Sequence, residues 1–269
     1  MSEDCSHDCS NCSKNCSERE SFIEKTNEFS DIKKVIGIVS GKGGVGKSFV
    51  TSLLAANTQK KGKKAAILDA DITGPSIPKM FGMKGEVTNE GNLMVPLESD
   101  SGTKVMSVNF LLKNETDPVI WRGPIIAGVV RQFWTDVIWD EIDCMYVDMP
   151  PGTGDVPLTV FQSLPVDGII VVTTPQDLVG MVVEKAVNMA KMMNIPVIGI
   201  VENMSYYECP NCKEKHEIFG KSHVEEIAKK YGIKNVVKIP MKEEYASICD
   251  EGKVENIEIT DIEKMIENI

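Results

Sequence analysis

Residues 41 to 48 read Gly-Lys-Gly-Gly-Val-Gly-Lys-Ser, a spacing of residues that can bind the phosphates of a nucleotide. Glycines let the backbone curl until several N–H groups point at one anion. Lys47 would reach the β- and γ-phosphates, and the Ser48 hydroxyl would ligate Mg²⁺. The predicted nucleotide-binding residues here are Gly41, Lys42, Gly43, Gly44, Val45, Gly46, Lys47 and Ser48. The alternative is a glycine turn before an ordinary helix.

Three aspartates follow or end short apolar runs and could act on magnesium and on water. Asp69 and Asp71 come at the end of one run, and Asp148 ends another. Ligands of open α/β sheets sit at the carboxyl ends of strands, so these acids should meet the phosphates there. We expect Asp71 to orient the attacking water, Asp69 to hold the water shell of Mg²⁺, and Asp148 to act on Mg²⁺ itself. The alternative role for Asp71 is a helix N-cap.

Asn203 follows a further apolar run and is predicted to contact the base of the nucleotide. Its side-chain amide offers both a donor and an acceptor to the edge of an adenine. The chain contains no Asn/Thr-Lys-x-Asp sequence, so the aspartate that usually reads guanine is missing. The sequence therefore favours ATP over GTP.

The first thirty residues carry four cysteines among polar and acidic residues, with almost no apolar residue before Phe22. Such a composition cannot bury a core, so any order there must come from a metal. The cysteines are spaced C-x3-C-x2-C-x3-C, and four thiolates could enclose one iron–sulfur cluster or a tetrahedral zinc ion. A disordered thiol-containing tail is the alternative. The candidate ligands are Cys5, Cys9, Cys12 and Cys16.

Cys209 and Cys212 form a second cysteine pair, spaced C-x2-C. Two thiolates fill half of a four-ligand site, and a two-fold interface that joins the same loop from two copies would supply all four. Three occupants stay open at this point: a cluster shared by two subunits, a zinc ion, or no metal. His216 could complete a zinc site within one chain if an outside ligand joined it.

The elements that must position these residues alternate between strand and helix from residue 31 onward. Apolar, β-branched runs predict buried parallel strands, and right-handed crossovers through the helices between them give a doubly wound α/β sheet. We expect a cysteine-rich extension over 1–30 and an ATPase domain over 31–269. Strands are predicted at 35–39, 64–69, 105–108, 143–148, 168–174, 197–201 and 236–239, and helices at 49–61, from 121 onward, at 179–193 and at 219–231. Residues 84–108 alternate between apolar and polar, and a hairpin is predicted there with its turn at 89–92. The apolar face of the helix from 121 onward should carry Ile125, Val129, Phe133 and Ile138.

Composition excludes several functional classes for this chain of 269 residues. A net charge of −11 argues against sequence-independent binding of nucleic acid, which needs a basic face. No apolar run approaches the roughly 20 residues that a membrane helix requires. The first thirty residues have the features of neither a signal peptide nor a transit peptide, so we expect a cytoplasmic protein whose eight cysteines stay reduced.

Lys42, directly after the first glycine, makes residues 41 to 48 resemble the deviant phosphate-binding loops of one ATPase subclass. In those ATPases two subunits face each other, and each sends this lysine across to the nucleotide of the other. The resemblance implies that Lys42 stabilises charge that develops in the transition state, as an arginine finger does. With Lys47 and Asp71, it completes the predicted catalytic set.

Five separated motifs together resemble the Mrp/ApbC family, the iron–sulfur cluster carriers within the MinD/ParA group. They are the loop at 41–48 and the segments 68–76, 121–124, 148–155 and 202–212, and the resemblance covers residues from about 33 to 255. It implies a homodimer that slowly hydrolyses ATP, binds a [4Fe–4S] cluster at its interface, and transfers the cluster to apoproteins. The N-terminal cysteines resemble the ferredoxin-like motif of cytosolic eukaryotic members, although here they are more tightly clustered.

Three other ATPase classes are the alternatives. A MinD- or ParA-type positioning ATPase needs a basic tail or patch to bind membrane or DNA, whereas residues 255–261 are acidic. A dimer stapled by zinc would resemble the ATPase that targets tail-anchored membrane proteins. A reductase similar to the nitrogenase iron protein would draw its cysteines from separate loops rather than from one C-x2-C pair.

Overall fold

The computed structural model describes residues 23–72, 74, 76–112, 123–152, 154–176, 179–267 and 269. The four predicted N-terminal ligands, Cys5, Cys9, Cys12 and Cys16, lie outside these residues, as do Trp121 and Arg122. Within the described part, no helix is both long enough and apolar enough to pass through a lipid bilayer.

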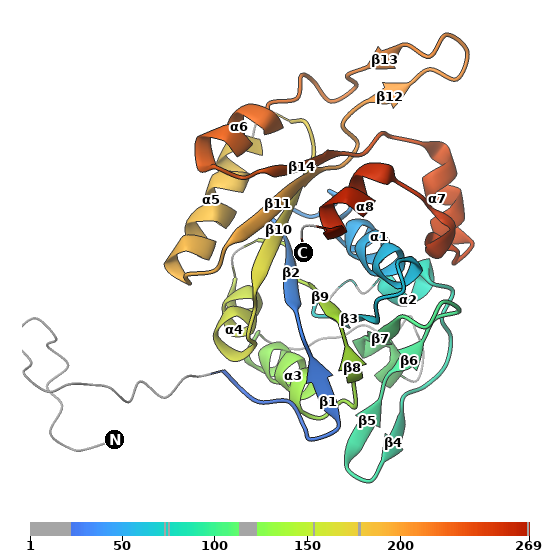
Figure 1. The fold of residues 1–269 in the computed structure, drawn as a ribbon, viewed down its shortest axis with the longest axis vertical. Helices are drawn as coiled ribbons and strands as arrows, with labels where there is room; N and C mark the ends of the chain where they lie inside the picture. The colour runs from blue at the N-terminus through green and yellow to red at the C-terminus, as the bar shows by residue number, and fades with distance from the viewer. Residues whose placement is uncertain are drawn as a thin grey trace, which may run out of the picture.

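A mostly parallel sheet forms the centre of the molecule, as the sequence predicts (Figure 1). Its central strands are buried on both faces, which explains their continuous apolar runs. Among the described strands of this sheet, only the edge strand β6 runs antiparallel to its neighbour. Across the sheet the strands are β14 (Asn235–Lys238), β11 (Val197–Glu202), β10 (Gly168–Thr173), β2 (Val35–Ser40), β9 (Cys144–Asp148), β3 (Ala65–Asp69), β7 (Lys104–Met106) and β6 (Leu97–Glu98).

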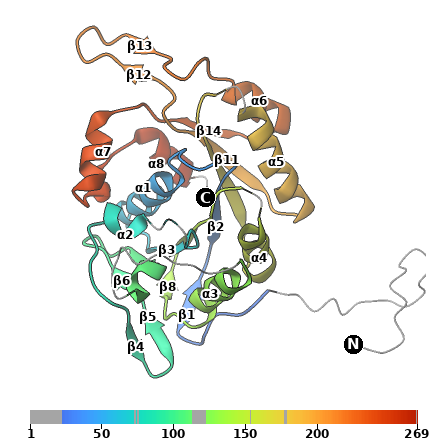
Figure 2. The same ribbon diagram turned by 180° about the vertical axis from the view of Figure 1, so that it is seen from behind.

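Helices cover both faces of the sheet, which makes three layers (Figures 1 and 2). One hydrophobic core lies between the sheet and the helices α3 (Gly123–Thr135), α4 (Asp155–Ser163), α5 (Val179–Met192) and α6 (Val224–Tyr231). The other lies beneath α1 (Lys47–Lys60), α2 (Ile77–Met80), α7 (Glu243–Asp250) and α8 (Thr260–Glu267), with the short 3-10 helices η1 (Val108–Leu111) and η2 (Val254–Asn256) nearby. The predicted doubly wound α/β fold is therefore confirmed.

Among the described residues, three two-stranded sheets stand apart from the central one. The predicted hairpin consists of β4 (Thr88–Glu90) and β5 (Leu93–Val95), and β1 (Ser30–Ile32) pairs with β8 (Asp140–Ile142). The third pairs β12 (Tyr207–Glu208) with β13 (Lys215–His216), and it projects from the top of the molecule in Figure 1. We call residues 207–216 the cysteine hairpin.

Two sequence expectations about helices are wrong in detail. Ile125 does not lie on the buried face of its helix: its side chain is 54% exposed, and the buried face of α3 carries Ile126, Val130 and Phe133. The helix predicted over 219–231 begins only at Val224, because residues 217–223 return the chain from the cysteine hairpin.

Residues just before the predicted domain boundary at 30/31 already pack on the α/β unit. The Glu24 carbonyl accepts a hydrogen bond from the Trp134 indole at 2.9 Å, and the Asn27 side chain donates to the carbonyls of Thr135 and Val137. Deleting the whole of 1–30 would therefore remove contacts that the domain makes.

Candidate nucleotide site and cysteine hairpin

The loop at 41–48 lies between β2 and α1, so the predicted strand, loop and helix are confirmed. Gly44 and Gly46 have φ angles of 78° and 83°, which favour glycine. A Cβ added to Gly46 would lie 2.2 Å from the side-chain nitrogen of Asn203, so a side chain at this position is excluded by space as well. Because α1 starts at Lys47, its N-terminal N–H groups face the loop, an arrangement that favours an anion.

Lys47 is buried among carboxylates at the carboxyl ends of β3 and β9. Its Nζ lies 2.8 Å from Asp148 Oδ2 and 3.4 Å from Asp71 Oδ2. Burial lowers the pKa of Lys47, but the charges of Asp148 and Asp71 outweigh burial, and the pKa is raised overall. The lysine is therefore a buried cation, held by two of the three aspartates that the sequence singles out.

Asp148 also accepts two hydroxyl hydrogen bonds from α1. Ser48 Oγ donates to Asp148 Oδ2 at 2.6 Å, and Thr51 Oγ1 donates to Asp148 Oδ1 at 2.7 Å. Thr51 is not among the residues predicted from the sequence, although its position one helical turn after Lys47 indicates that it lies on the same face of α1. A hydroxyl beside carboxylates is the oxygen donor set that suits Mg²⁺, so the residues fit that ion.

Asp69 lies next to Asp148 in register on the neighbouring strand and is fully buried. Its carboxylate accepts hydrogen bonds from Ser107 Oγ at 2.9 Å and from the backbone N–H of Asp71 at 3.2 Å. Burial, and after it the negative charge of Asp148, raise the pKa of Asp69 to about 8. Ser107 follows β7, the other neighbour of β3, and nothing in the local sequence marks it as a partner of Asp69.

Lys42, in the loop, and Gly152, after β9, both have hydrogen-bond partners in this chain. Lys42 Nζ donates a hydrogen bond to Gln176 Oε1, at the turn that follows β10. The N–H of Gly152 donates to the Ser40 carbonyl at 2.8 Å. Gln176 carries no sequence signal as a partner of Lys42.

Two cavities that share lining residues adjoin the loop at 41–48. One of about 240 Å³ is lined by the loop from Lys42 to Ser48 together with Asp71 and Pro151. The other, of about 370 Å³, shares Gly46, Phe49 and Met80 with it and is mostly apolar. Its remaining lining residues are Asn203, Met204, Pro240, Met241, Lys242, Tyr245, Ala246 and Cys249.

Asn203, the predicted contact of the base, lines this second cavity. Its side-chain amide is already engaged with protein, however. Nδ2 donates to the Val45 carbonyl in the phosphate loop at 3.0 Å, and Oδ1 accepts from the Met204 N–H at 3.0 Å. Asn203 therefore braces the loop in addition to facing the cavity.

Cys209 and Cys212 lie in the turn at the tip of the cysteine hairpin. The turn is closed by two backbone hydrogen bonds of 2.9 Å, from Cys209 N–H to the Glu214 carbonyl and from Lys213 N–H to the Cys209 carbonyl. Hydrogen bonds from the backbone N–H groups of Cys212 and Asn211 lower the pKa of Cys209, which favours the thiolate that binds metal.

His216 does not complete a metal site within the chain. Among the described residues, no three Cys, His, Asp or Glu side chains converge as a metal site. Cys212 is exposed and Cys209 half-buried, so both thiols are accessible from outside. The described hairpin of one chain thus presents two cysteine ligands rather than four.

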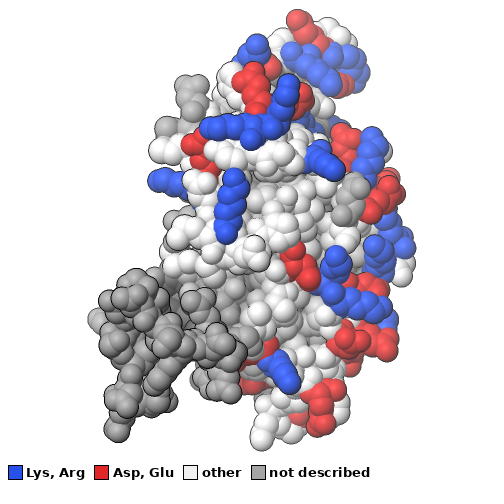
Figure 3. Space-filling model, turned by 60° about the vertical axis from the view of Figure 1, so that its left-hand side comes forward, with Lys and Arg blue, Asp and Glu red and all other residues white. Residues whose placement is uncertain are grey.

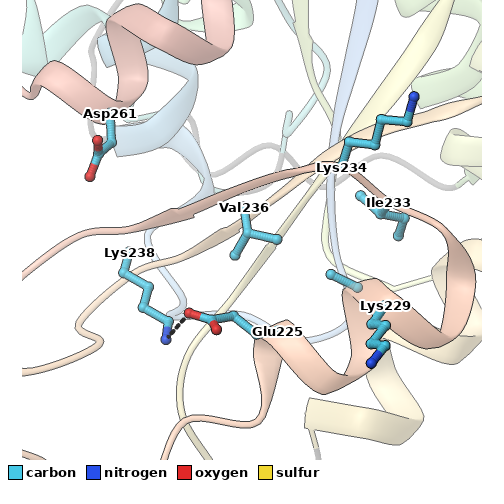
Figure 4. Close-up of a pocket in the computed structure, with 8 residues that line it drawn as sticks. Glu225, Lys229, Ile233, Lys234, Val236, Lys238 and Asp261 are labelled. Atoms are coloured by element: carbon cyan, nitrogen blue, oxygen red, sulfur yellow. Dashed lines mark hydrogen bonds and ion pairs between the residues drawn. The ribbon is translucent and has the colours of Figure 1, made fainter.

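A separate hollow of about 470 Å³ lies between α6, β14 and α8 (Figure 4). Lysines and acids line it, and Lys238 pairs with Glu225 at 2.8 Å. β14 is an edge strand, and lysines on an edge discourage pairing with other chains. None of the residues described above as phosphate or metal candidates lines this hollow.

Three exposed apolar side chains lie in the first turns of helices that start at the nucleotide edge of the sheet. They are Ile125 of α3, Leu158 of α4 and Met181 of α5, with 54%, 37% and 49% of their surfaces exposed. Figure 3 brings the side bearing α4 and α5 forward and shows few charged residues across the middle of this face. Exposed apolar side chains gathered at one edge are typical of a binding surface.

The chain matches one protein family and is similar to several known proteins. The family model described as ParA, NUBPL iron-transfer P-loop NTPase, matches residues 31–269. Iron-sulfur cluster carrier proteins of Clostridium perfringens and Methanocaldococcus jannaschii are 46% and 48% identical, over 84% and 83% of this chain and 82% and 78% of their own lengths. The iron-sulfur cluster transfer protein NUBPL of Dictyostelium discoideum is 41% identical over 82% of this chain and 69% of its own.

Solved structures agree with the fold. A nucleotide-binding protein from Archaeoglobus fulgidus, in complex with ADP and with cobalt found in it, has a TM-score of 0.77 and 46% identity, covering 85% of this chain and 90% of its own. The MinC:MinD cell division complex of Aquifex aeolicus has a TM-score of 0.62 at 17% identity, covering 87% of this chain and 94% of its own, a likeness of fold alone.

Proposed function

Because this chain belongs to the NUBPL iron-transfer P-loop NTPase family, we propose that it is an ATP-dependent iron–sulfur cluster carrier. Two copies bind one [4Fe–4S] cluster as cargo between their cysteine hairpins and pass it to apoproteins. The observation that carries the proposal is the projecting hairpin, whose two accessible thiols are half of a cluster's ligands. The reducing cytoplasm is the expected setting.

ATP would occupy the two adjoining cavities, with its phosphates in the loop and its adenine against the apolar wall. Lys47 would turn from Asp148 and Asp71 towards the β- and γ-phosphates, and the N-terminus of α1 would add partial positive charge. Ser48, Asp148 and Asp69 would hold Mg²⁺ and its water shell, and the ion would neutralise charge on the phosphates. Phe49 and Tyr245, whose rings lie 5.8 Å apart, would pack near the base.

Hydrolysis would depend on the second subunit, which is why we expect it to be slow. Asp71 would orient the attacking water, and Lys42 would leave Gln176 to reach the nucleotide of the partner. A cation supplied only by a facing subunit makes turnover conditional on dimerisation. The apolar first turns of α3, α4 and α5 would pack against that subunit at the same edge of the sheet.

A zinc-stapled dimer is the competing function, because four thiolates from two hairpins also suit tetrahedral zinc. Cluster transfer separates the two functions. We would replace Cys5, Cys9, Cys12 and Cys16 by Ser in the full chain, which keeps the contacts of Glu24 and Asn27, and reconstitute the protein anaerobically with iron and sulfide.

This quadruple variant should activate an apo-[4Fe–4S] enzyme at a rate that rises with its loading. Adding Cys209→Ser should abolish activation and leave ATP binding intact, because the hairpin tip is separate from the phosphate loop. Activation that persists with Cys209→Ser, or a protein that takes up zinc but no sulfide, would overturn the carrier function.

A further inference from the structure

We propose that Asn203 is a positioning residue that couples the phosphate loop to the cysteine hairpin, so that nucleotide binding changes how firmly the hairpin is held. The proposal rests on the proposed function for the identity of the cargo on the hairpin. The coupling itself depends only on contacts within the chain. It assigns to Asn203 a role beyond facing the base.

Asn203 is bonded on three sides where β11 ends. Its backbone N–H donates to the Thr173 carbonyl of β10 at 2.8 Å, which ties it to the sheet. Its side chain reaches the Val45 carbonyl at 3.0 Å, and only a glycine at position 46 leaves room for that amide. Only 5% of the residue's surface is exposed. Movement of the loop around phosphates must therefore move this amide or break its hydrogen bond.

Met204 connects Asn203 to Ser205, the start of the segment that leads into the cysteine hairpin. It has a φ of 55°, a left-handed conformation that is strained for a methionine, and its N–H is held by Asn203 Oδ1 at 3.0 Å. Ser205 then bonds twice, from its N–H to the Ile239 carbonyl at 2.9 Å and from Oγ to the buried Glu202 at 2.6 Å. Because Met204 is strained and both of its neighbours are hydrogen-bonded, a displacement of Asn203 is expected to move Ser205 as well.

The root of the hairpin also forms a wall of the base cavity. Met204 and Met241 both line that cavity, and the Met241 N–H donates to the Tyr206 carbonyl at 2.7 Å. Tyr207, the first residue of β12, forms a bridge with Met241 as well. A base in the cavity would press on two segments that hold the first arm of the hairpin.

Coupling of this kind is reciprocal: a nucleotide that stabilises one hairpin arrangement is itself bound more tightly when that arrangement is imposed. The test measures hydrogen–deuterium exchange by mass spectrometry in the reduced, full-length, metal-free chain, with and without saturating MgADP. Wild type should show slower exchange in the peptide spanning 207–216 when MgADP is bound, by about fivefold or more.

At MgADP concentrations that saturate the variant, shown by slower exchange in the loop peptide at 41–48, Asn203→Ala should lose the nucleotide effect on 207–216. Asn235→Ala is the matched control, because Asn235 makes the same kind of bond, from Nδ2 to the Ile198 carbonyl at 2.9 Å, away from the loop. This control should keep the nucleotide effect in full.

Met204→Gly is a second test of the coupling, which can be used if Asn203→Ala no longer binds MgADP. Glycine adopts the left-handed conformation without strain and makes the connection between Asn203 and Ser205 more flexible, so this variant, once saturated with MgADP, should lose the effect on 207–216. The proposal is overturned if wild type shows no nucleotide effect on the hairpin, or if Asn203→Ala or Met204→Gly, saturated with MgADP, keeps that effect. Neither result depends on iron or sulfide, so failure here is distinct from failure of cluster transfer.

Discussion

Asp148 is the residue on which the nucleotide site converges. It is fully buried and receives Lys47, Ser48 and Thr51 at 2.6 to 2.8 Å. A buried carboxylate is costly unless it is paired and hydrogen-bonded, and here both oxygens are used. Because Lys47 pairs with Asp148 and Asp71, these two carboxylates compete with the phosphates of ATP for the same cation.

Replacing Asp71 or Lys42 by Ala should separate ATP binding from hydrolysis. Lys47 keeps Asp148 in the Asp71→Ala variant, and the Lys42 ammonium bonds to Gln176 rather than to an acid of the site, so ATP affinity should stay within about threefold. Turnover should fall by about a hundredfold or more, because in the proposed mechanism both groups would act in the transition state. Calorimetry and a phosphate-release assay measure the two quantities. Equal losses of affinity and turnover would argue against these roles.

Asp69 should make the stability of the chain depend on pH. Its pKa is about 8 in the fold against 3.8 for an ordinary aspartate, so between these values the folded chain holds a proton that the unfolded chain releases. Stability from this group is therefore fully present below about pH 4 and is lost as the pH rises from there to about 8, by an amount of order a few kcal/mol.

Asp69→Asn removes that titration and keeps an oxygen that can accept from Ser107. In EDTA, thermal denaturation between pH 5 and pH 8 should show a shallower decline for the variant than for wild type. A variant whose melting temperature falls as steeply as that of wild type would show that another group is responsible.

Residues with a local signal were predictable, and residues that act through the fold were not. The loop from Gly41 to Ser48 and the acids at strand ends stand in sequence contexts that imply their positions. Ser107 and Gln176 join the site only because β7 and β10 deliver them beside Asp69 and Lys42. Such pairings depend on strand order, which no local pattern contains.

At the scale of elements, buried parallel strands were the most predictable part. Runs such as that of β2 are apolar throughout because helices cover both faces, and a short β-branched run of this kind strongly favours a buried strand. The helices were less certain. Ile125 belongs to the apolar periodicity of α3, yet its side chain is exposed at the start of the helix. Periodicity alone does not distinguish an apolar side chain in the core from one at the surface.

The cysteine hairpin had a recognisable motif, but its strands could not be predicted from the sequence. Its C-x2-C pair was evident, but the strands β12 and β13 are two residues each and too short to leave a periodic pattern. The hairpin is held instead by its turn and by Met241 at its root, which are contacts distant in sequence or made by the backbone.

At the scale of the whole molecule, the apolar edge predicts an ATP-dependent dimer. Met181→Asp places a charge in the first turn of α5, where the partner would pack, and should weaken dimerisation by about tenfold or more. Met192→Asp is the control, since it lies at the other end of the same helix and is 86% exposed. Sedimentation with a non-hydrolysable ATP analogue measures both. Equal effects of the two substitutions would contradict this interface.

The central claim is that two chains share one cluster through their hairpins, and native mass spectrometry under anaerobic conditions tests it most directly. The sample is the reconstituted full chain in which Cys5, Cys9, Cys12 and Cys16 are replaced by Ser. We predict a dimer whose added mass equals one [4Fe–4S] cluster, and loss of that mass when Cys209 or Cys212 is also replaced by Ser. One cluster on each monomer, or a cluster that survives both replacements, would contradict the claim.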